Sequence, residues 1–282
     1  MTTLCKSIVT FDEVELCVEM YGEQRDPPVL LIAGMSASML WWPGEVCEAI
    51  ASSGFFVIRY DQRDTGRSTS FPRGRPGYST HDLAADALRI CDSLGLPSTH
   101  VVGHSLGSGI ATILAVDHPD RLCSVTLIGA TTGAPDLPSG TGIFPVPPDD
   151  LDSRVAAIDY LLEDTRACDG LSPRFDEDRI RQFITNDVDR ADDIAATISN
   201  PPAMEFTHPR RGDLGTVSAP SLVMHGEMDS VFPVAHGEAV ARLIPDAAFV
   251  VLPGAGHTLL TADQADFTTP LIRHLRAAER RC

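Results

Sequence analysis

A serine flanked by glycines is the residue whose type and setting point most clearly to chemistry. The segment Gly103-His104-Ser105-Leu106-Gly107 follows a short apolar run and opens a helical pattern, which is the setting of a G-x-S-x-G nucleophile elbow. Because a strand must turn sharply into a helix there, side chains at positions 103 and 107 would collide with neighbouring backbone. We therefore expect Ser105 to present a nucleophilic hydroxyl above the edge of a sheet. The alternative is an inert serine in a glycine-rich turn.

A serine hydroxyl becomes a nucleophile only beside a base, and the base needs a group that orients it. We expect the base to be His257, which follows the last apolar run, where Gly254 and Gly256 let a loop carry the imidazole back over the sheet. The acid candidate is Asp229, in a loop directly after another apolar run, and Glu227 is the second candidate. Either carboxylate could instead only accept hydrogen bonds from amides at a helix N-terminus.

Backbone amides must stabilise the oxyanion that forms when a serine attacks a carbonyl. The Leu106 N–H lies at the start of a predicted helix, where helical amides have no internal acceptor. The second donor is expected in the loop after the run at 29–33, where Met35 is the first candidate and Ser36 the next. We expect Gly34, Ser36 and Phe232 to contact the substrate.

The elements that position these residues alternate in type. Apolar runs typical of strands buried on both faces lie at 29–33, 55–60, 100–103, 124–128, 221–224 and 248–252. Helical patterns lie between or after them at 42–53, 82–94, 106–116, 234–243 and 263–276, and 10–21 suggests two antiparallel strands. This alternation predicts an α/β fold with a mostly parallel central sheet flanked by helices.

The alternation stops between about 133 and 213. Residues 134–148 are rich in Pro and Gly and predict a loop, and 149–200 contains helical stretches without a strand-like run. We expect 1–133 and 213–282 to form the core and 134–212 to form an inserted helical cap. Its apolar residues predict packing within the cap, and some of them are expected to line the pocket: Val155, Ile158, Leu161, Leu162, Phe183 and Ile184. Its many carboxylates predict a solvated outer face, or an acidic lid that attracts cationic ligands.

Charge and composition restrict the partners. The 282 residues include 39 acidic and 22 basic side chains, for a formal net charge of −17, which opposes nucleic-acid binding. No apolar run is long enough to span a membrane, and the first residues do not resemble a signal peptide. The seven cysteines never form C-x-x-C, so we expect reduced thiols in a cytoplasmic protein with no metal or cofactor. The oligomeric state cannot be predicted.

Together these motifs resemble the α/β-hydrolase family over essentially the whole chain. The segment 60–68 matches the family loop D-x-R-G-x-G-x-S with Asp64 in place of the usual Gly, and Ala33-Gly34 replaces the usual His-Gly. With 31–34, Trp42-Pro43 and 54–60, this loop looks most like the serine esterase branch that includes the aclacinomycin methylesterases. In that branch Ser105, Asp229 and His257 would form the catalytic triad, and Met35 and Leu106 would supply the oxyanion donors.

The nucleophile narrows the activity expected from this resemblance. Haloalkane dehalogenases and epoxide hydrolases of this family have Asp at the elbow, so Ser105 argues against both. We expect a serine esterase whose substrate is a small hydrophobic ester, with a methyl ester of a polyketide-like compound as one candidate. A lactonase, an acyltransferase or a C–C bond hydrolase with the same three residues is the alternative, and a slow-turnover binding protein is a third.

Overall fold

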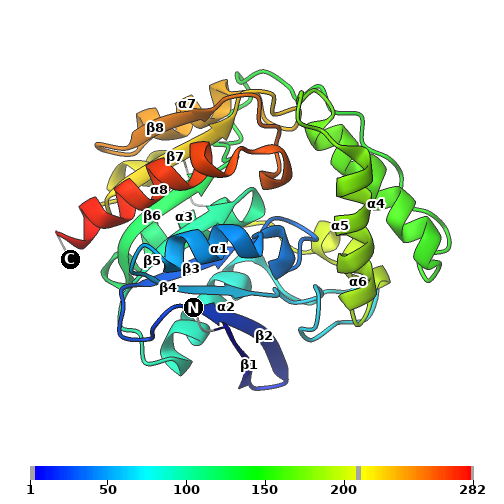
Figure 1. Ribbon diagram of the computed structural model, residues 1–282, viewed down its shortest axis with the longest axis horizontal. Coiled ribbons are helices and arrows are strands. Elements are labelled where there is room, and N and C mark those ends of the chain that lie inside the picture. Colours follow the sequence, from blue (N-terminus) through cyan, green and yellow to red (C-terminus); the bar gives the residue numbers. More distant parts are fainter. Residues whose placement is uncertain (1–3, 208–210, 281–282) are drawn as a thin grey trace.

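A single sheet, seen in the computed structural model, organises the described residues, 4–207 and 211–280 (Figure 1). Within this part of the chain the sheet has eight strands in the order β1-β2-β4-β3-β5-β6-β7-β8. β1 and β2 form an antiparallel hairpin, β2 pairs antiparallel with β4, and every other pairing is parallel. The strands are β1 (Leu4–Phe11), β2 (Val14–Tyr21), β3 (Pro28–Ile32), β4 (Phe56–Tyr60), β5 (Thr99–His104), β6 (Leu122–Ile128), β7 (Ser221–Gly226) and β8 (Ala248–Leu252).

Helices cover both faces of this sheet, because successive residues of each buried strand point to opposite sides. In β3, Leu30 packs with α2, α3 and α7 on one face, whereas Leu31 packs with α1 and α8 on the other. The predicted α/β class with a mostly parallel sheet is therefore confirmed. The flanking helices are α1 (Gly44–Ala51), α2 (Thr80–Ser93), α3 (Leu106–Asp117), α7 (Ala235–Leu243) and α8 (Gln264–Glu279).

The first hairpin differs from its prediction. Both strands were expected within 10–21, but β1 already begins at Leu4 and only β2 lies in that range. Alternation of polar and apolar residues is weak in β1, which is an edge strand with exposed side chains such as Ile8 (50% exposed). An edge strand buries few of its side chains, so the alternation of polar and apolar residues in its sequence is weak.

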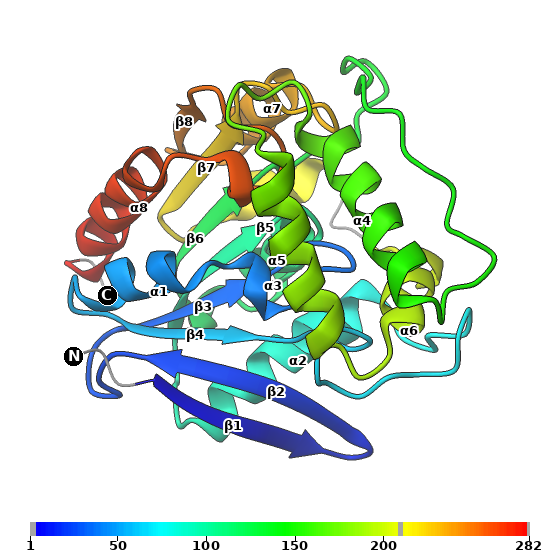
Figure 2. The ribbon, with the colours of Figure 1, turned by 45° about the vertical axis from the view of Figure 1, so that its right-hand side comes forward.

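Three α-helices lie in the described part of the interval between β6 and β7, where strand-like runs are missing. They are α4 (Arg154–Asp169), α5 (Glu177–Arg190) and α6 (Ile194–Ser199), and they share their own apolar cluster. Figures 1 and 2 both place them together beyond one end of the sheet strands. Val155 was expected to pack among these helices, and this prediction is wrong because the residue is 64% exposed.

Buried polar contacts join these helices to the loops that follow β3 and β4. On α5, the Asp187 carboxylate accepts hydrogen bonds from Ser38 and from the Trp41 indole (2.9 Å). Arg190, also on α5, forms an ion pair with the fully buried Asp61 (2.6 Å). The helical segment is therefore held to the core by paired charges as well as by apolar contact.

Asp64, the residue that departs from the family loop, adopts a left-handed backbone with φ 62°. Glycine tolerates this conformation best, but Asp visits it more readily than most residues. Its buried carboxylate accepts hydrogen bonds from Phe71 N (2.6 Å), the Tyr78 hydroxyl (2.8 Å) and Asn200 Nδ2 (3.0 Å). The Thr197 hydroxyl of α6 donates to its carbonyl (2.6 Å). Asp64 thus adopts a backbone conformation that glycine adopts more easily, and in return it forms hydrogen bonds with Thr197 and Asn200 of the helical segment.

Candidate active site

Ser105 lies in the tight turn between β5 and α3, with φ 51° and ψ −115°. A side chain on Gly103 would overlap the Gly107 carbonyl, and one on Gly107 would overlap the Ile32 carbonyl. The steric need for both glycines predicted from the sequence is therefore confirmed. The Ser105 amide donates to Ile128 O on the neighbouring strand β6 (2.8 Å). A strained conformation of this kind persists only where the surroundings determine it, and such strain clusters at functional sites.

The structure brings the three predicted side chains together in one chain of contacts. Ser105 Oγ lies 2.9 Å from His257 Nε2, and His257 Nδ1 lies 2.8 Å from Asp229 Oδ2. Asp229 comes from the loop after β7 and His257 from the loop after β8. The other Asp229 oxygen accepts hydrogen bonds from the amides of Val231 (2.9 Å) and Phe232 (2.8 Å). These two bonds orient the carboxylate toward the imidazole.

The electrostatics of the contact favour a charged imidazolium. Burial opposes charge on His257, but the adjacent Asp229 carboxylate outweighs this effect and raises the pKa of His257 above its ordinary value of 6.5. Burial alone would raise the pKa of Asp229, yet His257 and His225 hold it well below its ordinary value. By contrast, burial lowers the pKa of His104 in the elbow to about 4. His257 is thus the histidine suited to accept and stabilise a proton.

Glu227, the second acid candidate, does not contact the imidazole. Its exposed carboxylate accepts a hydrogen bond from Gly254 N (2.8 Å) and so supports the turn after β8. His225 instead reaches Asp229, with 3.2 Å between Nε2 and Oδ2. Sequence reasoning did not single out His225, because its position at the end of a strand predicted only a buried structural residue.

The loop after β3 lies against the elbow, as expected for a source of oxyanion donors. A Cβ on Gly34 would lie 3.5 Å from Ser105 Cβ. The Gln62 side-chain amide donates to Ala33 O (3.0 Å) and Gly34 O (3.3 Å), and Ser36 has a left-handed φ of 56°. Gln62 was missed by sequence reasoning because glutamine in a loop carries no distinctive signal.

Two cavities open onto Ser105 and share Met35 as a second lining residue. The first, about 230 Å³, is mainly apolar and is lined by Leu106, Phe232 and residues of α3 and α7. The Phe232 ring also meets the His257 ring edge to face, with 5.7 Å between centroids. The second cavity, about 290 Å³, lies between the core and α4, and Gly34, Ser36 and His257 line it. The predicted contact residues therefore divide between the two cavities.

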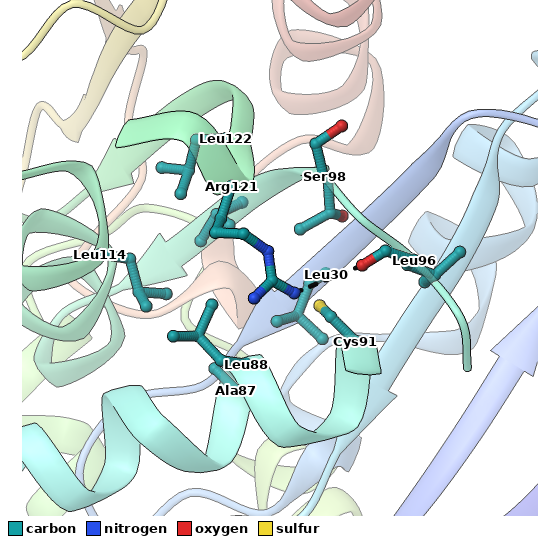
Figure 3. A pocket seen from close by; sticks show the side chains of 11 residues that line it. Leu30, Ala87, Leu88, Cys91, Leu96, Ser98, Leu114, Arg121 and Leu122 are labelled. Atoms are coloured by element: carbon teal, nitrogen blue, oxygen red, sulfur yellow. Dashed lines mark hydrogen bonds between the residues drawn. The ribbon is translucent and has the colours of Figure 1, made fainter. Parts of the chain in front are cut away.

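A third, much smaller space lies away from this site, among apolar residues of α2, α3 and β5 (Figure 3). Its volume is about 10 Å³, no more than one water molecule requires. The Arg121 guanidinium points across it and donates to Leu96 O (3.4 Å). This space is a packing gap and holds no ligand-sized group.

The C-terminal end of α4 holds the loop that carries His257. Asp169, fully buried, accepts hydrogen bonds from the Thr258 amide (2.8 Å) and from the Thr261 hydroxyl (3.2 Å). A side chain on Gly256 would overlap Asp169, which explains why a glycine precedes His257. Sequence reasoning missed Asp169 because it lies 88 positions before His257 in the chain.

In the described part of the chain, no group of three or more His, Cys, Asp or Glu side chains is arranged to hold a metal ion. None of the helices in the described ranges is long and apolar enough to cross a membrane.

Comparison with known proteins places this geometry in a family. Residues 27–261 match the model of the alpha/beta hydrolase fold. The chain is 32% identical to rhodomycin D methylesterase DauP of Streptomyces sp. (strain C5) and to rhodomycin D methylesterase DnrP of Streptomyces peucetius, covering 96% of this chain and 98% of each relative. The expected resemblance to methylesterases is thus confirmed.

Solved structures show the same fold. The esterase RhEst1 from Rhodococcus sp. ECU1013 superposes with a TM-score of 0.79 at 19% identity, covering 98% of this chain and 99% of that one. The enol-lactonase from Burkholderia xenovorans LB400 superposes with a TM-score of 0.74 at 24% identity, covering 96% and 100%. By its sequence match and its architecture, the chain belongs to the alpha/beta hydrolase fold family.

Proposed function

We propose that the protein is a carboxylic ester hydrolase that works through an acyl-enzyme on Ser105. The observation that carries the proposal is the unbroken contact from Ser105 through His257 to Asp229 at a point where two cavities meet. The two relatives named methylesterases, which this chain matches over nearly its full length, support the same class.

Each residue has a role that its surroundings allow. Ser105 attacks the ester carbonyl while His257 accepts its proton, and Asp229 stabilises the resulting imidazolium. The Met35 and Leu106 amides bind the oxyanion; the Leu106 amide lies in the first turn of α3, where the helix dipole favours negative charge. His257 then protonates the leaving alcohol and activates the water that hydrolyses the acyl-enzyme.

The cavities suggest the kind of ester. Each is smaller than a typical pocket for a drug-sized ligand, so an extended substrate would occupy both, with its carbonyl at Ser105. The apolar lining of the first cavity suits a hydrophobic acyl group, and a methyl ester of a polyketide-like or other small hydrophobic compound fits this description. We further propose that 134–212 acts as a cap, because Leu161 and Ile198 of its helices line the second cavity.

The direct test is Ser105→Ala, with Ser70→Ala at an exposed serine as the matched control. For p-nitrophenyl and methyl esters we expect kcat to fall by roughly 10⁴- to 10⁶-fold in Ser105→Ala only. A fluorophosphonate probe should label the wild type and the control but not Ser105→Ala. Wild-type rates in a folded Ser105→Ala variant would disprove the proposal. Product analysis with added alcohol separates hydrolysis from acyl transfer.

A further inference from the structure

The second cavity contains a carboxylate that the proposed reaction does not use. Asp164, on α4, lines this cavity together with Ser105 and His257 and is partly buried. Among the described residues no side chain or amide donates a hydrogen bond to it, and His257 is the only charged group that acts on it appreciably. This differs from Asp169, five residues later on the same helix, whose carboxylate accepts hydrogen bonds from Thr258 and Thr261.

Aromatic rings surround the same space. Tyr160 precedes Asp164 by one helical turn and lies on the same side of α4, and Trp41 and Phe144 also line the cavity. Trp41 is fixed in place, because its indole donates to Asp187 (2.9 Å) and its ring packs edge to face on Phe183 (5.1 Å between centroids).

An alkylammonium group is the ligand chemistry that these side chains match. The faces of aromatic rings attract cations, and rings placed around a cation recognise alkylated ammonium groups. A partly buried carboxylate adds a charge of the opposite sign and repels anionic substrates. A neutral hydroxyl could bond to Asp164 but would gain little from the three rings.

We propose that this cavity binds a protonated or quaternary alkylammonium group of the substrate, so that the enzyme prefers esters with a cationic substituent. The proposal rests on the proposed ester hydrolysis and adds a substrate class to it.

The test compares two series of methyl esters at several chain lengths. One series ends in a trimethylammonium group, and the other ends in the neutral tert-butyl group of the same shape. For the best chain length we expect the wild type to show a kcat/KM at least about tenfold higher for the cationic ester. Asp164→Asn should reduce this ratio about tenfold, and Tyr160→Leu about threefold. Asp164 could also act by stabilising the His257 imidazolium, but that effect applies to both series and cancels in the ratio.

Glu163→Gln is the matched control, because it removes a neighbouring carboxylate that is 56% exposed and paired with Arg166. It should leave the ratio unchanged. Thermal melting checks the folding of each variant, and if Asp164→Asn does not fold, the ratio in Tyr160→Leu decides. Tetramethylammonium should inhibit hydrolysis of the neutral ester competitively in the wild type, and tert-butanol at equal concentration should not.

Two outcomes would overturn the proposal: a wild-type ratio of one or less, or the wild-type ratio in folded variants that lack Asp164 or Tyr160. If the neutral esters are still hydrolysed through Ser105, only the ammonium site has failed. If the wild type hydrolyses no ester, the proposed function itself has failed.

Discussion

The buried position of His257 makes its protonation state decisive for the proposed reaction. Its ring is in contact with Ser105 on one side and Asp229 on the other, and Phe232 covers an edge. Only the neutral imidazole can accept the serine proton, whereas the Asp229 carboxylate favours the protonated form. The contact between His257 and Asp229 therefore stabilises the imidazolium in the transition state. It also means that a higher pH is needed to keep the imidazole neutral in the free enzyme.

We expect kcat/KM to rise with pH through a single ionisation whose midpoint lies above 6.5, because the pKa of His257 is raised above that value. Asp229→Asn should shift the midpoint downward and reduce kcat about 10⁴-fold. Glu227→Gln should change neither quantity, since Glu227 contacts Gly254 instead of His257. The measurement is a pH–rate profile of the three proteins, and an unshifted midpoint in Asp229→Asn would contradict the assignment of the acid.

Residues that act through local backbone geometry could be predicted, and residues that act across the chain could not. Gly103 and Gly107 flank Ser105 for a steric reason visible in five residues of sequence. The sequence favours Asp229 over Glu227 as the acid, but excluding Glu227 requires knowing how the chain turns after β7. Asp164 and Asp169 lie near His257 only because α4 packs on the core, and no local sequence pattern encodes that packing.

Among the helices, the C-terminal end of α4 supports the loop that carries His257, the proposed base. Besides the Asp169 contacts, the Ser172 hydroxyl donates to Gly254 O (2.5 Å) and the Cys168 carbonyl accepts from His257 N (3.4 Å). A small displacement of this loop would move the imidazole from its position beside Ser105, and catalysis is sensitive to shifts of about 1 Å.

Asp169 also predicts a pH effect on stability. Burial raises its pKa from 3.8 to about 6, so the folded protein binds this proton more tightly than the unfolded chain does. The stabilisation from Asp169 is complete below about pH 4 and is lost as the pH rises through about 6. The free energy of unfolding of the wild type should therefore fall relative to that of Asp169→Asn between pH 4 and 7. Denaturant titrations of both proteins at these pH values measure the difference, and a constant difference would contradict the prediction.

Asp64 allows the cost of a left-handed backbone to be separated from the value of its hydrogen bonds. Both Asp64→Ala and Asp64→Gly leave the donors of Phe71, Tyr78 and Asn200 without their acceptor, so each should lose about 3 kcal/mol of stability. Asp64→Gly should be the more stable of the two by about 1 kcal/mol, because only glycine adopts φ 62° without strain. Chemical denaturation provides both values, and equal stability of the two variants would show that the backbone is relaxed.

Across the whole molecule, strand and helix alternation was enough to predict the sheet, because β3, β4, β5, β6 and β7 are buried strands. The run at 248–252 also forms a strand, but the expectation that it is buried on both faces is wrong, because β8 is a partly exposed edge strand. The segment 149–200 was predicted as helical because it contains helical patterns and no strand-like apolar run. What could not be predicted was how α4, α5 and α6 meet the core, since ion pairs such as Arg190–Asp61 join residues 129 positions apart.

The net charge of −17 acts on every approaching substrate. If the second cavity takes an ammonium group, kcat/KM for a cationic ester should fall about threefold or more between 10 and 500 mM salt, because salt screens long-range attraction. The value for the isosteric neutral ester should stay nearly constant. Initial rates at low substrate concentration measure both, and equal salt dependence for the two esters would contradict electrostatic steering.

The polar contacts between the inserted helices and the core constrain how this segment can be exchanged among relatives. A chimera that received 134–212 from another protein would leave the buried Asp61 without Arg190 of α5, and unpaired buried charge is strongly destabilising. Asp64 would lose its hydrogen bonds from Thr197 and Asn200. Grafting a new specificity onto this scaffold therefore requires the donor segment to arrive together with the loops after β3 and β4.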